Sequence, residues 1–120
     1  MDKPILFSLP GNAELTLALS KMLSIEMGKT EFRTFPDRES YIRIHSQVKN
    51  KTIILVCTLA KPNSKILPLL FMASTIKELG AKRICLVAPY LAYMRQDIRF
   101  HTGEAITSII FAQLLSSYID

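Results

Sequence analysis

Residues 52–60 read TIILVCTLA, a run of β-branched and apolar residues without alternation. Such a run is typical of a strand covered on both faces, as in the middle of a parallel sheet. Residues 83–88 (RICLVA) predict a second buried, central strand, and residues 4–9 (PILFSL) predict a third. Helix-patterned segments separate these strands, which favours an α/β fold with a mostly parallel sheet and helices on both faces.

Three segments carry apolar residues at helical spacing. The third segment is apolar around much of its circumference, so another surface is expected to cover it. A glycine follows each of the first two segments, where it suits a helix C-cap. The expected helices are Ala13 to about Glu26, closed by Gly28; Asn63 or Ser64 to Leu79, closed by Gly80; and residues 104–119.

Residues 30–46 predict a β-hairpin. Strand-like segments at 30–35 and 40–46 flank Pro36-Asp37-Arg38-Glu39, which predicts the tip. In the second strand Tyr41, Arg43 and His45 alternate with Ile42 and Ile44, so one face is expected to be polar and the other buried.

The composition indicates one globular domain spanning residues 1–120. A hydrophobic fraction of 49% and a charged fraction of 21% exclude disorder. No run reaches the ~18 apolar residues of a membrane span. Asp2 and Pro4 interrupt the N-terminus, so no signal peptide is expected and the chain is predicted to be cytoplasmic, with no membrane partner. Cys57 and Cys85 lie in apolar strand-like runs and are expected to be buried, reduced thiols rather than a disulfide.

The net charge of +5 leaves three interpretations open. No basic block is longer than Lys82-Arg83, and aromatic residues are not interleaved with the cations. A solvated surface is therefore the first interpretation, a basic site for an anionic small molecule the second, and nucleic-acid binding the least favoured. His45 and His101 have no companion ligands at metal spacing, so no metal site is predicted.

Polar residues cluster after the predicted 83–88 strand. Arg95-Gln96-Asp97 and Arg99 follow two tyrosines, Tyr90 and Tyr93. Open α/β sheets bind ligands at the carboxyl ends of their strands, and an arginine, an amide and a carboxylate suit a phosphate-bearing ligand. The alternative is an Arg95–Asp97 surface ion pair that braces the loop. The tyrosines are expected to pack rather than react.

Four segments together resemble the N-terminal half of ribose-phosphate pyrophosphokinases, also called phosphoribosyl pyrophosphate synthetases. The resemblance implies a type I phosphoribosyltransferase-like fold and transfer of diphosphate from ATP to ribose 5-phosphate, with Mg²⁺, in nucleotide biosynthesis. The segments that carry it are Phe35-Pro36-Asp37-Arg38-Glu39, the strand at 52–58, residues 88–97 (APYLAYMRQD) and Gly103-Glu104-Ala105-Ile106.

The resemblance also implies roles for named residues. It places ATP on the loop of Arg95, Gln96, Asp97 and Arg99. It makes the hairpin tip, with Phe35, Asp37, Arg38 and Glu39, a cover for the adenine of a neighbouring subunit, so a homo-oligomer is expected. The chain departs from the family pattern at Arg38, where glycine is common, and at Ile98, where a basic residue is common.

The family's metal-binding Asp-x-His segment, mobile catalytic loop and Thr-Gly-Gly-Thr loop have no counterpart in these residues. The C-terminal catalytic half is therefore expected beyond Asp120, with most of the magnesium ligands and the ribose 5-phosphate site. The resemblance thus implies no catalytic residue within the chain and no activity of the chain alone. Two alternatives are a non-catalytic regulatory domain that pairs with a complete synthetase, and an unrelated flavodoxin-like binding domain.

Overall fold

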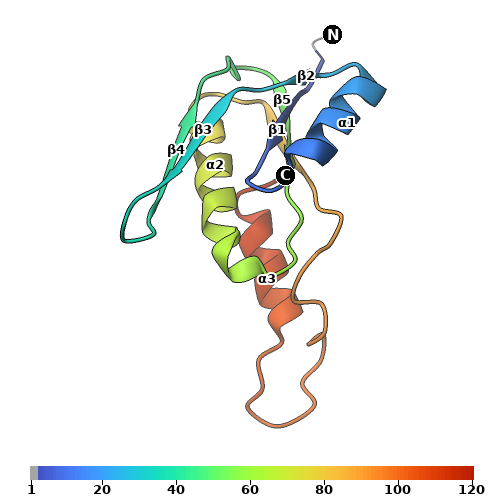
Figure 1. Cartoon of the computed structure of the whole chain (residues 1–120). Helices are drawn as coiled ribbons and strands as arrows, with labels where there is room; N and C mark the ends of the chain where they lie inside the picture. Colours follow the sequence, from blue (N-terminus) through green and yellow to red (C-terminus); the bar gives the residue numbers. More distant parts are fainter. Residues whose placement is uncertain (1–2) are drawn as a thin grey trace.

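The computed structural model describes residues 3–120 as a four-stranded parallel sheet, a separate antiparallel hairpin and surrounding helices (Figure 1). The strand order of the sheet is β2-β1-β5-β6, and the hairpin pairs β3 with β4. The elements are β1 (Ile5–Ser8), α1 (Ala13–Leu23), β2 (Glu26–Met27), β3 (Thr30–Thr34), β4 (Ser40–Ile44), β5 (Thr52–Val56), a 3₁₀ turn η1 (Pro62–Ser64), α2 (Ile66–Glu78), β6 (Arg83–Val87) and α3 (Thr107–Ser116).

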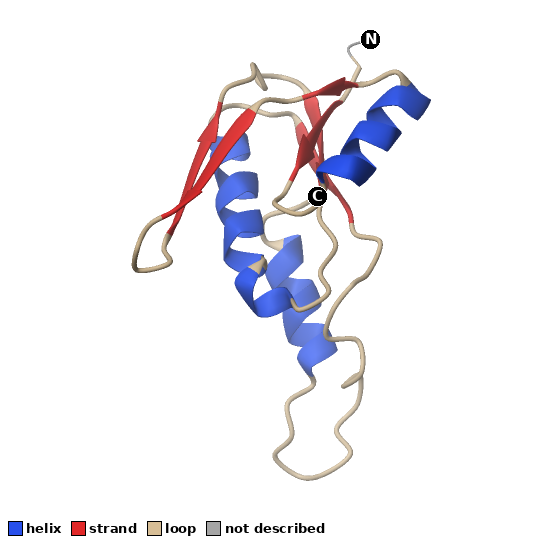
Figure 2. Ribbon diagram, in the orientation of Figure 1, coloured by secondary structure: helices blue, strands red, loops and turns tan. Residues whose placement is uncertain are grey.

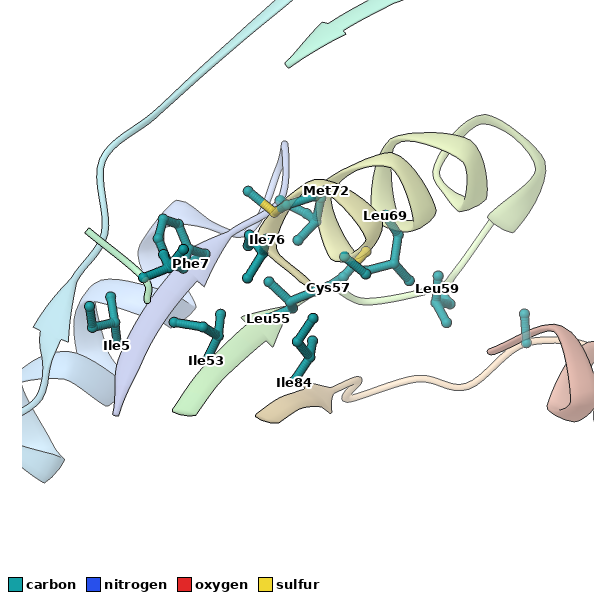
Figure 3. Close-up of a cluster of buried hydrophobic side chains, with 14 of the residues drawn as sticks. Ile5, Phe7, Ile53, Leu55, Cys57, Leu59, Leu69, Met72, Ile76 and Ile84 are labelled. Atoms are coloured by element: carbon teal, nitrogen blue, oxygen red, sulfur yellow. The ribbon is translucent and has the colours of Figure 1, made fainter. Parts of the chain in front are cut away.

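The core lies between the sheet and α2. Ile53 and Leu55 of β5 are fully buried, and Ile53 pairs in register with Ile5 of β1 and Ile84 of β6. Figure 3 shows the side chains of Met72 and Ile76 of α2 over this face of the sheet. Helix α1 lies on the opposite side of the sheet (Figure 2). The predicted α/β fold with helices on both faces is confirmed.

Strand β6 lies at the edge of the described sheet, so the prediction of a buried, central 83–88 strand was wrong. Only Ile84 of this strand is buried, and Val87 is 38% exposed. Ile84 lies on the face of the strand that packs against α2. The outer edge of β6 has no neighbouring strand in the described sheet, so the rest of the apolar run stays partly exposed. At that edge the Asp120 backbone N–H donates to the Ile84 carbonyl at 2.9 Å, and the Asp120 carboxylate accepts from the Ile84 N–H at 2.8 Å.

Helix α1 ends before its predicted end. Ser24 takes a left-handed conformation with φ 54°, and its N–H and that of Ile25 both donate to the Ser20 carbonyl. The backbone then turns into β2, which pairs with β1 through Glu26. The expected cap at Gly28 was wrong, because Ser24 closes the helix.

Gly28 has a packing role in place of the predicted cap. Its N–H donates to the Leu6 carbonyl at 2.7 Å. A Cβ at this position would lie 2.2 Å from Cε1 of Phe7, whose side chain is fully buried. The close approach of backbone to aromatic ring therefore requires glycine.

The other two helices are shorter than predicted. Before α2, Pro62–Ser64 forms a 3₁₀ turn, and neither Asn63 nor Ser64 caps the helix with its side chain. Helix α3 begins at Thr107 and not at residue 104, because the Glu104 N–H and carboxylate bond to His101 in the preceding loop. None of the helices among the described residues is long and apolar enough to cross a membrane.

Helix α3 is only half covered. Phe111, Leu115 and Ile119 pack against the same core as α2. On its outer side, Ile109 is 51% and Ile110 is 58% exposed. The predicted apolar circumference is present, and no element formed by residues 3–120 covers Ile109 and Ile110 on its outer side.

The hairpin has the predicted strands and tip. Its side chains Phe32 and Ile44 pack against the core, whereas Arg43 is exposed, as the alternation predicted. At the tip the Arg38 N–H donates to the Phe35 carbonyl at 2.8 Å, and Arg38 adopts φ 72°. Arg38 therefore adopts the left-handed conformation that glycine takes readily. The presence of arginine where the family commonly has glycine thus leaves the turn intact.

We expect Gly28→Ala to lower the free energy of unfolding by ~1–3 kcal/mol, the usual effect of overpacking a core. Urea denaturation of both proteins measures the difference. Lys29→Ala, in the same turn, is the control and should change stability by less than ~0.5 kcal/mol. An unchanged midpoint for Gly28→Ala would contradict the close approach to Phe7.

We expect Arg38→Gly to raise the free energy of unfolding by ~0.5–1 kcal/mol. Glycine relieves a left-handed cost of ~1–2 kcal/mol, and its greater freedom in the unfolded chain cancels part of the gain. Arg38→Ala keeps the same backbone cost and should leave stability within ~0.5 kcal/mol of the parent. Equal stability of the two variants in urea would show that the turn is unstrained.

Candidate functional site

The candidate site lies at the carboxyl edge of the parallel sheet. Strands β1, β5 and β6 run in the same direction, so the segments that follow them meet at one edge. These segments are residues 9–12, 57–65 and 88–106. The longest of them, between β6 and α3, extends away from the sheet beyond the start of α3 (Figure 1).

A buried asparagine joins two of these segments. The Asn12 side chain, only 4% exposed, accepts from the Thr58 N–H at 3.0 Å and donates to the carbonyls of Leu9 and Pro10. Asn12 precedes α1 but does not cap it with its side chain. Its amide instead fixes the segment after β1 to the segment after β5.

A cavity of 840 Å³ lies between η1 and the segment after β6. It falls within the range of ~300–1,000 Å³ that is typical of small-molecule sites. Its lining contains two cations and no carboxylate. The lining residues are Lys61, Pro62, Asn63, Ser64, Tyr90, Ala92, Tyr93, Met94, Arg95, Gln96 and Thr107.

Tyr93 connects the two walls of this cavity. Its hydroxyl donates to the side-chain oxygen of Asn63 in η1. Its ring packs against Phe111 of α3, with ring centroids 5.1 Å apart. The Leu59 N–H also donates to the Tyr90 carbonyl at 2.9 Å. The packing role predicted for Tyr93 is thus observed, and it fixes the separation of the walls.

Gln96 anchors the Arg95 loop to the start of α3. Its carbonyl accepts from the Ser108 N–H at 3.3 Å, and its side-chain oxygen accepts from the Thr107 hydroxyl at 3.4 Å. Gln96 lines the cavity, so its remaining side-chain donor group lies beside any ligand there.

The structure contains no Arg95–Asp97 ion pair. Both side chains are exposed, and among residues 3–120 neither forms a salt bridge. The alternative interpretation, in which an Arg95–Asp97 ion pair braces the loop, is therefore not supported. The Arg99 Nε donates to the Glu104 carbonyl at 2.8 Å, so part of this guanidinium already bonds to its own loop.

The hairpin tip lies at a different corner of the molecule (Figure 1). None of its residues lines the cavity. Phe35 is 44% exposed and packs edge-on against Tyr41, and the Asp37 carboxylate accepts from the Glu39 N–H at 3.0 Å. Arg38 and Glu39 are exposed. The structure thus brings Arg95 and Gln96 to one cavity and leaves the tip residues outside it.

The remaining reactive side chains lie elsewhere. Both cysteines are free, but only Cys57 is buried, and burial raises the pKa of its thiol; the prediction that Cys85 is buried was wrong, because β6 lies at the edge of the sheet. His45 Nε2 lies 3.4 Å from a Glu31 carboxylate oxygen on the hairpin. In the described part of the chain, no three His, Cys, Asp or Glu residues lie together as metal ligands would.

The sequence reasoning missed Lys61 and Asn63. A usable signal was present, because Lys61-Pro62-Asn63 follows β5 as Arg95 follows β6. Ligand sites at the carboxyl ends of strands can involve every strand of a parallel sheet, so this segment is expected at the same edge as the Arg95 loop.

Comparisons with known proteins agree with this arrangement. The sequence model of the N-terminal domain of ribose phosphate pyrophosphokinase matches residues 4–118. A ribose-phosphate pyrophosphokinase of Saccharolobus solfataricus is 46% identical over 100 residues, which are 82% of this chain and 34% of that protein. The corresponding protein of Methanobrevibacter smithii is 35% identical over 109 residues, 89% of this chain and 37% of that protein.

Two solved structures share the fold. The phosphoribosylpyrophosphate synthetase of Mycobacterium smegmatis matches 98% of this chain and 40% of its own chain, with a TM-score of 0.85 and 25% identity. A purine phosphoribosyltransferase of Pyrococcus horikoshii matches 75% of this chain and 64% of its own, with a TM-score of 0.55 and 21% identity, and so supports the fold alone. The predicted phosphoribosyltransferase-like fold is confirmed.

The chain spans about a third of the length of the curated relatives that it matches. The match of the family model over residues 4–118 includes the hairpin, the cavity and the Arg95 loop. The chain therefore belongs to the family of the N-terminal domain of ribose phosphate pyrophosphokinase.

Proposed function

We propose that this chain is the ATP-binding part of a ribose-phosphate diphosphokinase, and that the phosphates of ATP lie in the cavity beside Arg95. One observation carries this proposal: Arg95 is exposed, forms no ion pair with any of residues 3–120, and lines a cavity without carboxylates at the carboxyl edge of a parallel sheet. Membership of the family removes the flavodoxin-like alternative. The regulatory-domain alternative has no observation in its favour.

The proposed chemistry moves the β,γ-diphosphoryl group of ATP to the 1-hydroxyl of ribose 5-phosphate. Such transfers depend on positioning and on neutralising the charge of the phosphate oxygens. In this chain Arg95 would donate two parallel hydrogen bonds to phosphate oxygens, and Gln96 would donate from its amide. The chain alone is expected to form no phosphoribosyl pyrophosphate, since the proposal gives it no ribose 5-phosphate site.

Magnesium is the metal that the family implies. Asp97 is exposed beside Arg95, but among residues 3–120 no group of three metal-ligating side chains comes together. Mg²⁺ in nucleotide sites usually takes one or two carboxylates together with phosphate oxygens and water, so Asp97 could supply at most part of its ligands here. We assign no step of the reaction to a metal held by this chain, and expect its ligands mainly beyond Asp120.

The hairpin tip is proposed to serve the site of a second copy. Phe35 is exposed and could stack on a base, and Glu39 offers a free carboxylate for an adenine amine. Because the tip lies outside the cavity of its own chain, a second copy must bring the two together. The chain is therefore proposed to act as a homo-oligomer in the cytoplasm.

We expect Arg95→Ala to weaken ATP binding by ~1.5–3 kcal/mol, the usual contribution of a charge-assisted hydrogen bond. Titration calorimetry of the 120-residue chain with ATP measures the change. The control is Lys82→Ala, because Lys82 precedes β6 and lies at the opposite edge of the sheet. It should change the binding free energy by less than ~0.5 kcal/mol. Equal losses in both variants would mean that only diffuse positive charge attracts the nucleotide.

We expect the chain to self-associate through the outer side of α3, since Ile109 and Ile110 are more than half exposed. Sedimentation velocity at tens of micromolar should detect a dimer or a larger species. The variant Ile110→Glu should shift the chain toward monomer, and Met22→Glu on α1, also a change from an exposed apolar residue to a glutamate, serves as the matched control. A monomer over the whole concentration range would refute this prediction.

A further inference from the structure

We propose that Lys61 is a second phosphate-binding residue, which contacts the terminal phosphates of the nucleotide from the wall opposite Arg95. This inference rests on the proposed function and extends it to a residue outside the family motifs discussed above. The ligand it implies is a nucleotide with two or three phosphates in a chain. Lys61 belongs to the segment after β5, and Arg95 belongs to the segment after β6.

The first argument is electrostatic. Lys61 and Arg95 line one cavity, and no carboxylate lines it with them. Neither residue takes part in an ion pair in the described part of the chain. Two unpaired cations that face the same cavity form a site for an anion. A polyphosphate fits a site with a cation on each wall better than a single phosphate group does, because it can contact both walls at once.

The second argument compares the cations around the cavity. The Lys65 ammonium donates to the Ala60 carbonyl at 2.5 Å, and the Arg99 guanidinium donates to the Glu104 carbonyl at 2.8 Å. Both groups are therefore partly occupied by their own loops. Lys61 makes no side-chain hydrogen bond to any residue from 3 to 120, so its three donors are available to a ligand.

The third argument is the backbone of the two walls. Lys61 adopts φ 52° and Tyr93 adopts φ 63°, a conformation that residues other than glycine rarely take. Residues held in such conformations cluster at ligand sites, where the surrounding structure fixes them. Here the Tyr93 hydroxyl bonds to Asn63, two residues after Lys61, and the Tyr93 ring packs on Phe111. The two walls, each with its cation, are therefore held at a fixed separation.

The test is calorimetric titration of the 120-residue chain with ATP and with AMP at one ionic strength. We expect Lys61→Gln to weaken ATP binding ~10–150-fold, the range that corresponds to one lost charge-assisted hydrogen bond. AMP binding should change less than ~2-fold, because AMP lacks the terminal phosphates that Lys61 contacts. Lys61→Arg keeps the charge and should bind ATP within ~3-fold of the parent.

Lys65→Gln is the matched control. It removes the same charge from the same turn, but from an ammonium that bonds to Ala60. It should weaken ATP binding less than ~2-fold, and thermal denaturation checks that each variant is folded.

Equal effects of the Lys61 and Lys65 variants, or equal losses for ATP and AMP, would overturn the inference. If Arg95→Ala weakens ATP binding and Lys61→Gln does not, this inference fails alone. If Arg95→Ala has no effect, the proposed function fails.

Discussion

The parallel pairing of β5 with both β1 and β6 is the constraint on which the site depends. Leu55 pairs in register with Phe7 on one side and Leu86 on the other. Because all three strands run in one direction, the segments that leave them must meet at one edge of the sheet. An antiparallel β6 would send Lys61 and Arg95 to opposite ends of the sheet. The cavity is therefore a consequence of sheet topology before any polar contact forms.

Polar contacts then hold together the segments that the sheet places close to one another. The Asn12 amide is almost fully buried and satisfied by backbone groups of two segments, so its loss would leave buried donors and acceptors without partners. Tyr93 joins η1, the Arg95 loop and α3 with one hydroxyl and one ring. Neither contact involves Arg95 or Lys61, so both cations of the cavity lining keep their donors free.

The sequence predicted much of the fold because its signals are local. Unbroken apolar runs marked β1, β5 and β6, and alternation around Pro36–Glu39 marked the hairpin. The errors arose where tertiary contacts decide. Gly28 looks like a helix cap, but the ring of Phe7 excludes any side chain there. Residues 83–88 look central, yet β6 lies at the edge, since an apolar run cannot distinguish one buried face from two.

The site was predicted only in part for a related reason. Arg95 and Gln96 were found from a motif within one segment, whereas the opposite wall with Lys61 lies more than thirty residues earlier in the chain. Only the parallel sheet brings the two walls together, so no local pattern links them. The hairpin tip presents the converse case. Its motif is clear, but the tip lies away from the cavity of its own chain. A local sequence pattern does not show whether such a tip completes the site of its own chain or that of another copy.

Two like charges on one cavity are tolerated because both side chains, Lys61 and Arg95, are exposed to solvent. Repulsion between unit charges is ~1 kcal/mol at 4 Å in water and falls further with salt. A phosphate chain that enters would reverse the sign of this interaction and displace the water, which strengthens each contact. The cavity offers no carboxylate to read an amine of a base. Under the proposed function, the two cations of the lining select for phosphate number, and the hairpin tip of another copy adds carboxylates that can accept from the base.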